Sequence, residues 1–550
     1  MKEFYLAGYD VSGIQNFIFN SPVLKEIIGA SHIVHNVLDK TLPKVIEEYG
    51  KQHNLKVRVK WKENENPLDF LMLEDDDLAA EVVYIGGGNA YVAYRSKEIG
   101  IEITKIFSKT VYEETESLFI AVGFVHVRPE DDLREVFGNK LPRVLNQNKA
   151  SMLRTKPLLN IAITRQDIST GHPVIEKNND EYLTRDRKLK LTVYKNEIDK
   201  IFNKLLPDNS AKKYEFIREF DDLILEKGED SFIGVVHIDG NNMGDTIHKI
   251  MNEANLSMNE YVKKIRKISD AITQTYVKAF KVMTNHLAEY LQTNNQNYEK
   301  TMLPLRPIIV NGDDITFVCQ ARLALSLVEI FLKEINKNKL DDKYPLSACA
   351  GIFYCRSHYP FHLAYELSEQ ACRNAKYKAK AHAKKYNCSI KSWVDFAISY
   401  QGMTNSLNNV RERTYNLPEL GEVVMFSTED SSYKGYNLLN RPYLVSDESQ
   451  GKVFELAFFK DLMKYLTKSK DRWPNSKLKE LRNAFLVSSV LVEKLLRENQ
   501  ARGRVLYKGK YKLHEALLRG FFEVQKYTPF FDVLEMLDLY EDVGGVNNED

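Results

Sequence analysis

Hydrophobic and polar positions along the first 130 residues follow two periods, that of a strand and that of a helix. Apolar or alternating runs predict strands, and runs with a period near 3.6 residues predict helices. The predicted elements are a strand over 4–10, a helix over 22–49, strands over 81–85 and 90–94, a helix over 97–116 and a strand over 118–127. This β-α-β-β-α-β order is typical of a ferredoxin-like unit, whose middle strands form a hairpin.

The same order of elements occurs a second time. The elements are a strand over 232–239, a helix over 258–291, strands over 307–310 and 315–319, a helix over 321–335, a strand over 346–354 and a further helix over 360–385. The strand end Asp10 lies 78 residues before Gly88, and the strand end Asp239 lies 74 residues before Asp313. Because strand ends and hairpin turns match together, we expect an internal duplication. Two unrelated copies of a common unit are the alternative.

Polar segments separate and follow the two units. Residues 131–230 are rich in Lys, Asp and Asn and predict a connector, and residues 452–540 have helical spacing, as in LKELRNAFLVSSVLVEKLL over 478–496. We therefore expect an α+β protein with two ferredoxin-like domains. The expected domains are 1–130, a connector over 131–230, a second ferredoxin-like domain over 231–395 and a mostly helical domain over 396–550.

Composition excludes several classes of protein. Lys and Arg number 77 against 76 Asp and Glu, so no global positive field attracts nucleic acid, although a local basic groove stays possible. No stretch holds 18 uninterrupted apolar residues, so we expect no contact with a membrane. The five cysteines form no CxxC pair, which predicts reduced thiols and no zinc. The start of the chain does not resemble a signal peptide, and we expect a cytoplasmic protein.

Three carboxylates are the strongest candidates for chemistry. Asp239 ends one apolar strand, and Asp313 and Asp314 occupy the hairpin turn beside it. Neighbouring carboxylates repel unless a cation neutralises them, and hard oxygen ligands suit Mg²⁺ or Mn²⁺. Such sites serve phosphoryl transfer, and Gly312 would let a triphosphate approach the turn. The alternative is that Asn-Gly-Asp-Asp is only a tight turn.

Several segments resemble a known family. HIDGNNMG (237–244) and VNGDDITFV (310–318) are similar to the palm of the large subunit of type III CRISPR effector complexes. YDVSGIQNFIFNSPVLKEIIGAS (9–31) resembles the first palm of that family, and AGIFYCRSHYPFHLAYELSEQACRNAK (350–376) resembles its last strand and helix. The resemblance covers about residues 1–130 and 230–395.

The resemblance implies a function and a set of roles. The family synthesises cyclic oligoadenylate from ATP, so Asp239, Asp313 and Asp314 are expected to be catalytic and to bind Mg²⁺ or Mn²⁺, with Lys376 near the triphosphate. The resemblance also implies antiviral defence. Guide RNA and other subunits of an effector complex are possible partners, bound through the C-terminal helical domain.

The chain departs from the family at several positions. Asn241 stands where a second strand-end aspartate is usual, and Asn311 replaces the first glycine of the turn, so the metal site depends on Asp239, Asp313 and Asp314 and has fewer carboxylates for a second ion. DISTGHPV (167–174) resembles a T-G-x-P element, but the zinc-binding cysteines are missing. No His-Asp dipeptide occurs, so we expect no N-terminal nuclease domain of the His-Asp type.

The first unit is expected to bind a nucleotide without performing chemistry. Its turn carries no carboxylate, but a glycine-rich backbone can lie against a nucleotide. The residues expected to bind nucleotide are Asp10, Ser12, Gly13, Gly86, Gly87, Gly88, Gly312 and Lys376. Alternatively, the turn is only a turn, and Ser12 caps the segment that follows.

Two further features have simpler interpretations. His237 shares a strand face with Asp239, and we expect a packed histidine beside the site rather than a metal ligand. Lys378 and Lys380 are expected to lie on a solvated helix face.

We therefore expect a nucleotidyltransferase that joins ATP into short or cyclic oligoadenylate. A stand-alone defence cyclase that makes another cyclic nucleotide and a non-catalytic scaffold that binds nucleotide or RNA remain alternatives.

Overall fold

A computed structural model gives the fold of the chain. It describes residues 3–21, 23–61, 69–86, 88–154, 163–167, 171–178, 181–207, 214–223, 231–252, 256–294, 302–400, 402–415, 438–446, 451–470, 472–511 and 528–544. Gly87 of the first predicted turn and residues 168–170 of DISTGHPV lie outside the described residues.

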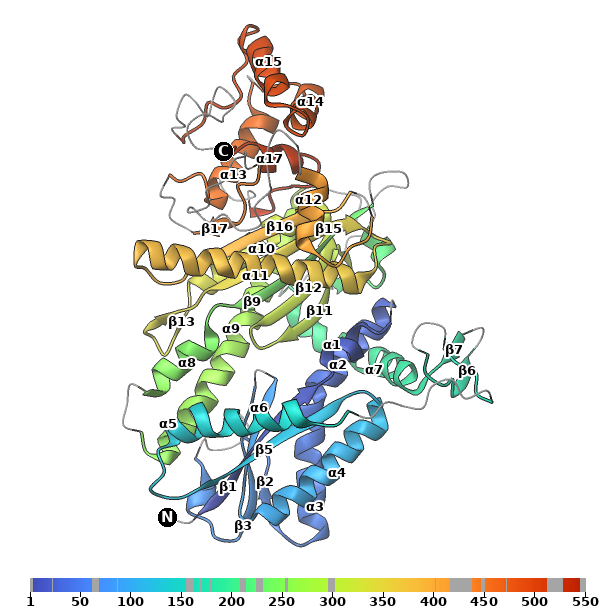
Figure 1. The fold of residues 1–550 in the computed structure, drawn as a ribbon, viewed down its shortest axis with the longest axis vertical. Coiled ribbons are helices and arrows are strands. Elements are labelled where there is room, and N and C mark those ends of the chain that lie inside the picture. The colour runs from blue at the N-terminus through green and yellow to red at the C-terminus, as the bar shows by residue number, and fades with distance from the viewer. Residues whose placement is uncertain are drawn as a thin grey trace.

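The first unit is built on a five-stranded sheet with the order β2-β3-β4-β1-β5 (Figure 1). Its elements are β1 (Phe4–Ser12), α1 (Ile14–Phe19), α2 (Leu24–Asn36), α3 (Leu42–Gln52), β2 (Lys56–Arg58), β3 (Leu78–Gly86), β4 (Asn89–Tyr94), α4 (Lys97–Thr115) and β5 (Phe119–Val127). β3 and β4 form the predicted hairpin, and β1 lies between β4 and β5, antiparallel to both. The sequence pattern does not predict α1 or β2.

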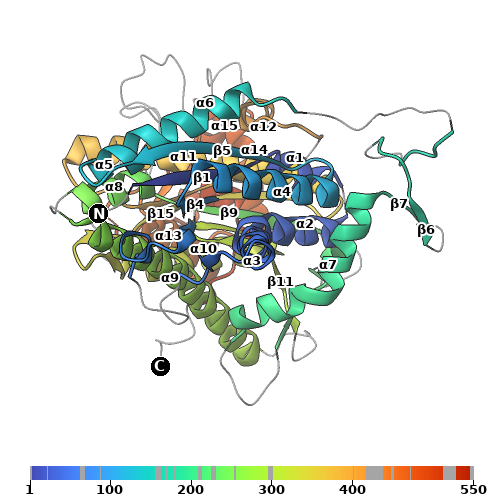
Figure 2. The ribbon, with the colours of Figure 1, turned by 90° about the horizontal axis from the view of Figure 1, so that it is seen from below.

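Helices cover both faces of this sheet. The Tyr9 ring contacts Phe107 of α4, whereas a Cβ added at the adjacent Gly8 would lie 3.2 Å from Leu141 on the opposite face. Leu141 begins α6 (Leu141–Ser151), which follows α5 (Leu133–Glu135) and lies over β5 (Figure 2). Because successive side chains of a strand point to opposite faces, α4 and α6 enclose the sheet.

The second unit repeats this arrangement in a six-stranded sheet with the order β11-β12-β9-β15-β16-β17. Its main elements are β9 (Phe232–Gly240), α8 (Met243–Asn252), α9 (Met258–Thr293), β11 (Leu305–Asn311), β12 (Asp314–Gln320), α10 (Ala321–Asn336), β15 (Ala348–Arg356) and α11 (Phe361–Tyr386). In both sheets the strand order is second, third, first, fourth. The α+β class with mixed sheets is confirmed, because β2 pairs with β3 and β16 with β15 in parallel, and the other neighbouring strands of these two sheets pair antiparallel.

Two strands extend the second sheet beyond the predicted unit. β16 (Ser392–Ile398) is buried along its whole length and pairs in parallel with β15, and α11 is the crossover between them. β17 (Tyr443–Val445) adds an edge strand. The C-terminal helices are α12 (Leu407–Tyr415), α13 (Leu456–Lys468), α14 (Asn475–Phe485), α15 (Ser489–Gln500) and α17 (Phe531–Glu535). The helical pattern over 478–496 is broken between α14 and α15, where Ser488 caps α15.

The connector has fewer regular elements. Besides α5 and α6, they include α7 (Arg185–Phe202) and the short strands β6 (Glu176–Asn178), β7 (Glu181–Leu183) and β8 (Glu215–Phe216). The second unit adds β10 (Met302–Leu303), β13 (Lys339–Leu340) and β14 (Tyr344–Pro345). α7 crosses α2 so closely that a Cβ on Gly29 would lie 2.1 Å from the carbonyl oxygen of Lys190. The connector is therefore packed against the first unit.

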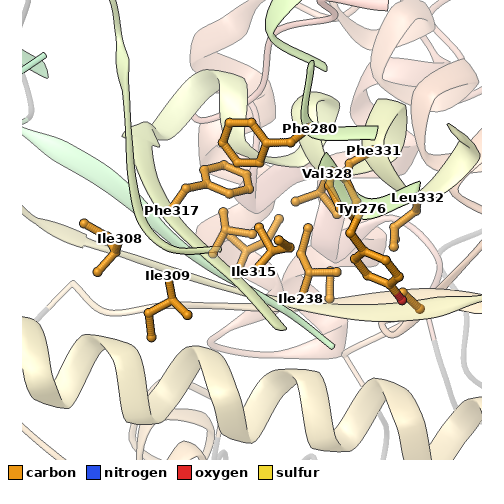
Figure 3. Packing of buried hydrophobic residues seen from close by; sticks show 14 of the residues in the cluster. Ile238, Tyr276, Phe280, Ile308, Ile309, Ile315, Phe317, Val328, Phe331 and Leu332 are labelled. Atoms are coloured by element: carbon orange, nitrogen blue, oxygen red, sulfur yellow. The ribbon is translucent and has the colours of Figure 1, made fainter. Parts of the chain in front are cut away.

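α9 joins the two units. Ser257 and Glu260 form a capping box at its start, and the helix continues for 36 residues. Near its start Arg266 contacts β3 of the first sheet, and further along Phe280 packs on Phe317 of the second sheet (Figures 1 and 3). The apolar cluster of Figure 3, which includes Ile238 and Ile315, fills the space between α9, α10 and the second sheet.

Two further findings bear on the expectations from composition. In the described part of the chain, no helix is both long and apolar enough to cross a membrane. All five cysteines are free, and only Cys388 is exposed.

Candidate metal and nucleotide site

The three predicted carboxylates lie at the same end of the second sheet. Asp314 is the register partner of Asp239 on β9 and of Asn311 across the hairpin. Asp313 and Gly312 form the turn, and Gly312 has a φ of +57°, which glycine adopts without strain. The duplicated strand order therefore brings the strand end and the hairpin turn together, as the sequence predicts.

The alternation of side chains divides these carboxylates between two faces. His237 and Asp239 of β9 face α11, where they approach Tyr365 and Lys376. Gly240 faces α9, and a Cβ added there would lie 2.6 Å from Asp313 Oδ2. Asp313 thus reaches around the strand end toward α9, whereas Asp239 lies on the α11 side.

Asp314 carries a buried oxygen without a counter-charge of its own. Its Oδ1 is buried and has no hydrogen-bond partner among the described residues, although the side chain as a whole is 43% exposed. Burial, reinforced by the charges of Asp239 and Asp313, raises the pKa of Asp314 to about 8. Burial and Asp239 also raise the pKa of Asp313. Each carboxylate therefore disfavours the charge on the next, as expected where a cation is needed.

Lys376 supplies one positive charge to this site. Its Nζ donates to Asp239 Oδ2 over 2.5 Å and to the carbonyl oxygen of Gly240 over 2.8 Å. Burial acts in the opposite direction, but the Asp239 carboxylate raises the pKa of Lys376, which stays protonated. The lysine that the resemblance places near a triphosphate thus contacts the strand-end carboxylate.

The donor set suits a divalent cation held together with substrate. Among the described residues, no group of three or more His, Cys, Asp or Glu side chains forms a ready-made metal cage. Mg²⁺ is usually bound through one or two carboxylates, with waters and substrate phosphates completing its shell. The unpartnered Asp314 Oδ1 and the half-exposed Asp239 are hard oxygen donors of this kind. The residues present therefore fit Mg²⁺ or Mn²⁺.

Asn241 is turned toward neighbouring strands. Its Nδ2 donates to Ser347 Oγ over 3.0 Å and to the carbonyl oxygen of Lys391 over 3.2 Å. Its backbone N–H donates to the carbonyl oxygen of Ser347 over 2.9 Å. The Asn241 amide therefore links the end of β9 to the loops before β15 and β16.

His237 is packed beneath the site, as expected. Its Nδ1 lies 3.2 Å from Thr316 Oγ1 and 3.5 Å from Asp314 Oδ1, and its ring meets Tyr365 edge-on. Burial lowers the pKa of His237 to about 4. The imidazole is therefore neutral at pH 7.

The first unit has a pocket at the equivalent strand end. Asp10 pairs with Lys149 of α6 over 2.7 Å, and Arg154 donates to Ser12 Oγ over 3.0 Å. Beside Asp10 lies an open pocket of about 320 Å³ lined by Val11, Ser12, Gly13, Ile14, Gln15, Asn16, Lys149 and Arg154. Gly13 has a φ of +89° and begins α1. Sequence reasoning found Asp10, Ser12 and Gly13 but missed the two cations, which come from the connector.

The first hairpin turn faces α9. A Cβ on Gly86 would lie 2.5 Å from Ser269 Oγ, so this glycine allows a close approach of the helix. Gly88 has a φ of +76° and open space around it. Gly87 lies outside the described residues.

One family model matches part of the chain. Residues 232–385 match the family model described as Cas10/Cmr2, second palm domain. This segment runs from the start of β9 almost to the end of α11, and it contains Asp239, Asp313, Asp314 and Lys376. The predicted resemblance is therefore confirmed for the second unit. A comparison with curated proteins finds no match.

Solved structures that contain Csm1 match this chain at low sequence identity. The chain is 15% identical to a chain of the apo Csm1-Csm4 cassette, with a TM-score of 0.48, and the match covers 98% of this chain and 70% of that one. For Csm1 in T. onnurineus, the identity is 15%, the TM-score 0.46 and the coverage 98% and 69%. For the Csm1-Csm4 cassette in complex with AMPPNP, the identity is 15%, the TM-score 0.47 and the coverage 97% and 69%.

Proposed function

We propose that this chain is a metal-dependent nucleotidyltransferase that joins ATP through 3′–5′ bonds into short or cyclic oligoadenylate. The observation that carries the proposal is the meeting of Asp239, Asp313 and Asp314 at adjacent strand ends, within the segment that matches a Cas10/Cmr2 second palm. A role in antiviral defence within the cytoplasm accompanies this proposal through the family resemblance.

The residues of the second unit divide the work of phosphoryl transfer. Asp239, Asp313 and Asp314 would hold Mg²⁺ or Mn²⁺, which supplies charge neutralisation for the leaving pyrophosphate. Lys376 would exchange its contact with Asp239 for one with the triphosphate, since both are anions within reach of a flexible side chain. The 3′-hydroxyl of one ATP attacks the α-phosphorus of the next, a phosphodiester bond forms, and the bond to pyrophosphate breaks.

The first unit would hold the nucleotide that supplies the 3′-hydroxyl. Its pocket places Lys149 and Arg154 beside Ser12 and Gly13, and two cations can bind a triphosphate. α9 contacts the turn of the first hairpin and the end of β9, with Ser269 against Gly86 and Tyr276 against Gly240. Seven residues of helix span about 10 Å, so α9 keeps the first turn and this strand end a short distance apart.

The test is to incubate the protein with each nucleoside triphosphate and Mg²⁺ or Mn²⁺ and to identify the products by mass. We expect ATP to give oligoadenylate and pyrophosphate. The absence of any such product, for every triphosphate and with either ion, would contradict the proposal. Consumption of ATP by the double variant Asp313→Ala, Asp314→Ala at the wild-type rate would contradict it as well.

A scaffold that binds nucleotide without polymerising it is the second candidate. It is favoured by the ion pair of Lys376 with Asp239, which already neutralises one of the three carboxylates. In that case ATP would bind with the same affinity with and without a divalent cation.

The proposed partners, guide RNA and other effector subunits, would bind the C-terminal helices. On the described part of this region, Val487, Val490 and Leu491 are 62%, 73% and 38% exposed around the start of α15. Such a cluster suits a contact with another protein chain. Co-purification with candidate subunits, compared between the wild type and Val490→Glu, tests this proposal.

A further inference from the structure

Tyr276 of α9 carries a buried hydroxyl that the packing of the core does not explain. The side chain is 0% exposed, its ring meets Phe331 at a centroid distance of 6.0 Å, and its hydroxyl has no hydrogen-bond partner among the described residues. Leaving a buried polar group unsatisfied costs about 1–3 kcal/mol. A phenylalanine would fill the same space without this cost, so packing of the core does not account for the hydroxyl.

The hydroxyl lies at the edge of the core, beside the candidate metal site. A Cβ added at Gly240 would lie 2.9 Å from Tyr276 Oη and 2.6 Å from Asp313 Oδ2. The two oxygens therefore border the same small space above Gly240. In Figure 3 the Tyr276 ring packs with the apolar cluster, and its oxygen lies at the cluster's margin.

Chemistry sets the direction of any bond between these two groups. A tyrosine hydroxyl carries its proton at neutral pH, so its O–H is available as a donor. An ionised carboxylate only accepts hydrogen bonds. A hydroxyl aimed at this space can therefore orient Asp313, and it cannot act as a base.

We propose that the Tyr276 hydroxyl donates a hydrogen bond to the Asp313 carboxylate and so positions it to receive the divalent cation. This inference rests on the proposed function and names Tyr276 as a positioning residue of the same site. Partners that orient ligating carboxylates typically change metal affinity or activity 10- to 100-fold when removed. Asp313 needs such a partner, because it reaches the site from a turn and Lys376 binds Asp239 instead.

Gly240 has a matching role. Any side chain at this position would fill the space between Tyr276 Oη and Asp313 Oδ2. Its φ is not in the left-handed region, since Gly240 is not among the glycines with positive φ. The absence of a side chain at Gly240 therefore leaves the space between the hydroxyl and the carboxylate open.

The experiment compares Tyr276→Phe with a matched control, Tyr354→Phe. Tyr354 is also fully buried, its hydroxyl also has no hydrogen-bond partner among the described residues, and it lies on β15 opposite Gly234. Gly234 is five residues from Asp239 along β9, about 17 Å. Both variants remove one hydroxyl from the same core.

Two readouts are measured for each variant. The first is the rise in melting temperature on titration with Mn²⁺ in the presence of a non-hydrolysable ATP analogue, and the second is the apparent KM for Mn²⁺ in product formation. We expect Tyr276→Phe to raise the Mn²⁺ concentration needed in both assays about tenfold or more. Its melting temperature without metal should equal or exceed that of the wild type, and Tyr354→Phe should leave the Mn²⁺ dependence unchanged.

Equal Mn²⁺ dependence in Tyr276→Phe and the wild type would overturn the inference. A wild type that makes no product but is stabilised by Mn²⁺, more strongly than Tyr276→Phe, would contradict the proposed function and support this inference. Gly240→Ala is the second variant, and it should also weaken the Mn²⁺ response because its methyl group separates the two oxygens.

Discussion

Replacing Arg266 with methionine tests whether α9 must hold the two units at a fixed spacing. Arg266 is 1% exposed and binds β3 through Nε to the carbonyl oxygen of Val83 over 2.7 Å and Nη2 to that of Val82 over 2.9 Å. Its Nη2 also lies 3.2 Å from Glu81 Oε1, and Glu81 is fully buried. The Arg266 guanidinium thus links α9 of the second unit to β3 of the first unit through hydrogen bonds.

The cost of the change can be worked out from these contacts. Removing one partner of a buried ion pair typically costs about 3–5 kcal/mol. Arg58 remains 2.8 Å from Glu81 Oε1 and keeps part of the charge compensated, so we expect the lower end, about 3 kcal/mol. For a cooperative unit of 150–250 residues this lowers the melting temperature by about 6–12 °C.

The matched control is Lys263→Met, one turn earlier on α9. Lys263 pairs with Asp69, but both side chains are at least 40% exposed, and such pairs contribute about 0–1 kcal/mol. The assay follows product formation from ATP and Mn²⁺ at a temperature where both variants are folded. It also follows stabilisation by Mn²⁺, which depends on the second unit alone.

We expect Arg266→Met to lower product formation at least tenfold and to keep the Mn²⁺ stabilisation, because only the relation between the two units changes. Two results would refute this reasoning. One is a melting temperature within 2 °C of the wild type, and the other is a loss of product formation no larger than in Lys263→Met.

Three further predictions concern the site itself. Asp313→Ala with Asp314→Ala should abolish product formation without lowering the melting temperature, because burial and mutual repulsion already disfavour the ionised form of both carboxyl groups in the folded protein. Melting followed by circular dichroism and a product assay check this prediction. Mn²⁺ should support activity at least as well as Mg²⁺, and Asn241→Asp should reduce the difference in activity between the two ions. The same substitution should lower the free energy of unfolding by about 1–3 kcal/mol, since the amide donors to Ser347 and Lys391 are lost. Lys149→Gln with Arg154→Gln should raise the KM for ATP about tenfold, because the pocket loses both of its positive charges. Lys508→Gln, on an exposed loop, should leave the KM unchanged, and initial rates at varied ATP concentration check both variants.

The strands and hairpins could be predicted from the sequence because local pattern specifies them. β9, β12 and β4 begin and end within one residue of the predicted runs, and α9 starts where predicted, at its capping box. Each of these elements is defined by its own residues, through periodicity, glycine turns or caps.

The helix predicted over 22–49 is present from Leu24 to Gln52, but it contains a π-helical turn that the sequence pattern does not predict, and the reason is a proline. A π-helical turn over Val37–Thr41 separates α2 from α3, and Pro43 occupies the first turn of α3. Proline has no N–H to donate, so the hydrogen-bond ladder of the preceding turn is interrupted. Pro142 stands in the same place in α6, after the π-helical turn Val136–Lys140. The sequence signal is a Leu-Pro pair inside a helical pattern.

The missed residues of the site all come from distant parts of the chain. Lys149, Arg154 and Tyr276 carry no motif, and their contacts join segments 139, 142 and 36 residues apart in sequence, from Asp10, Ser12 and Gly240. Periodicity predicts that Tyr276 is buried, but it does not predict what the hydroxyl faces. Only the packing of α9 and α6 on the sheets supplies these contacts.

Side-chain alternation also explains why three adjacent carboxylates do not make a complete metal cage. Asp239 and Gly240 are consecutive on β9, so their side-chain positions face opposite sides of the sheet. Asp239 faces α11, Gly240 faces α9 without a side chain, and Asp313 lies beside Gly240. A second strand-end carboxylate at position 241 would lie on the Asp239 side, but Asn241 is bonded to Ser347 and Lys391. The carboxyl groups on the α11 side are thus those of Asp239 and Asp314, and Lys376 pairs with Asp239. A divalent cation would therefore bind firmly only with a triphosphate that both draws Lys376 away and completes the oxygen shell, which makes binding of metal and ATP mutually dependent.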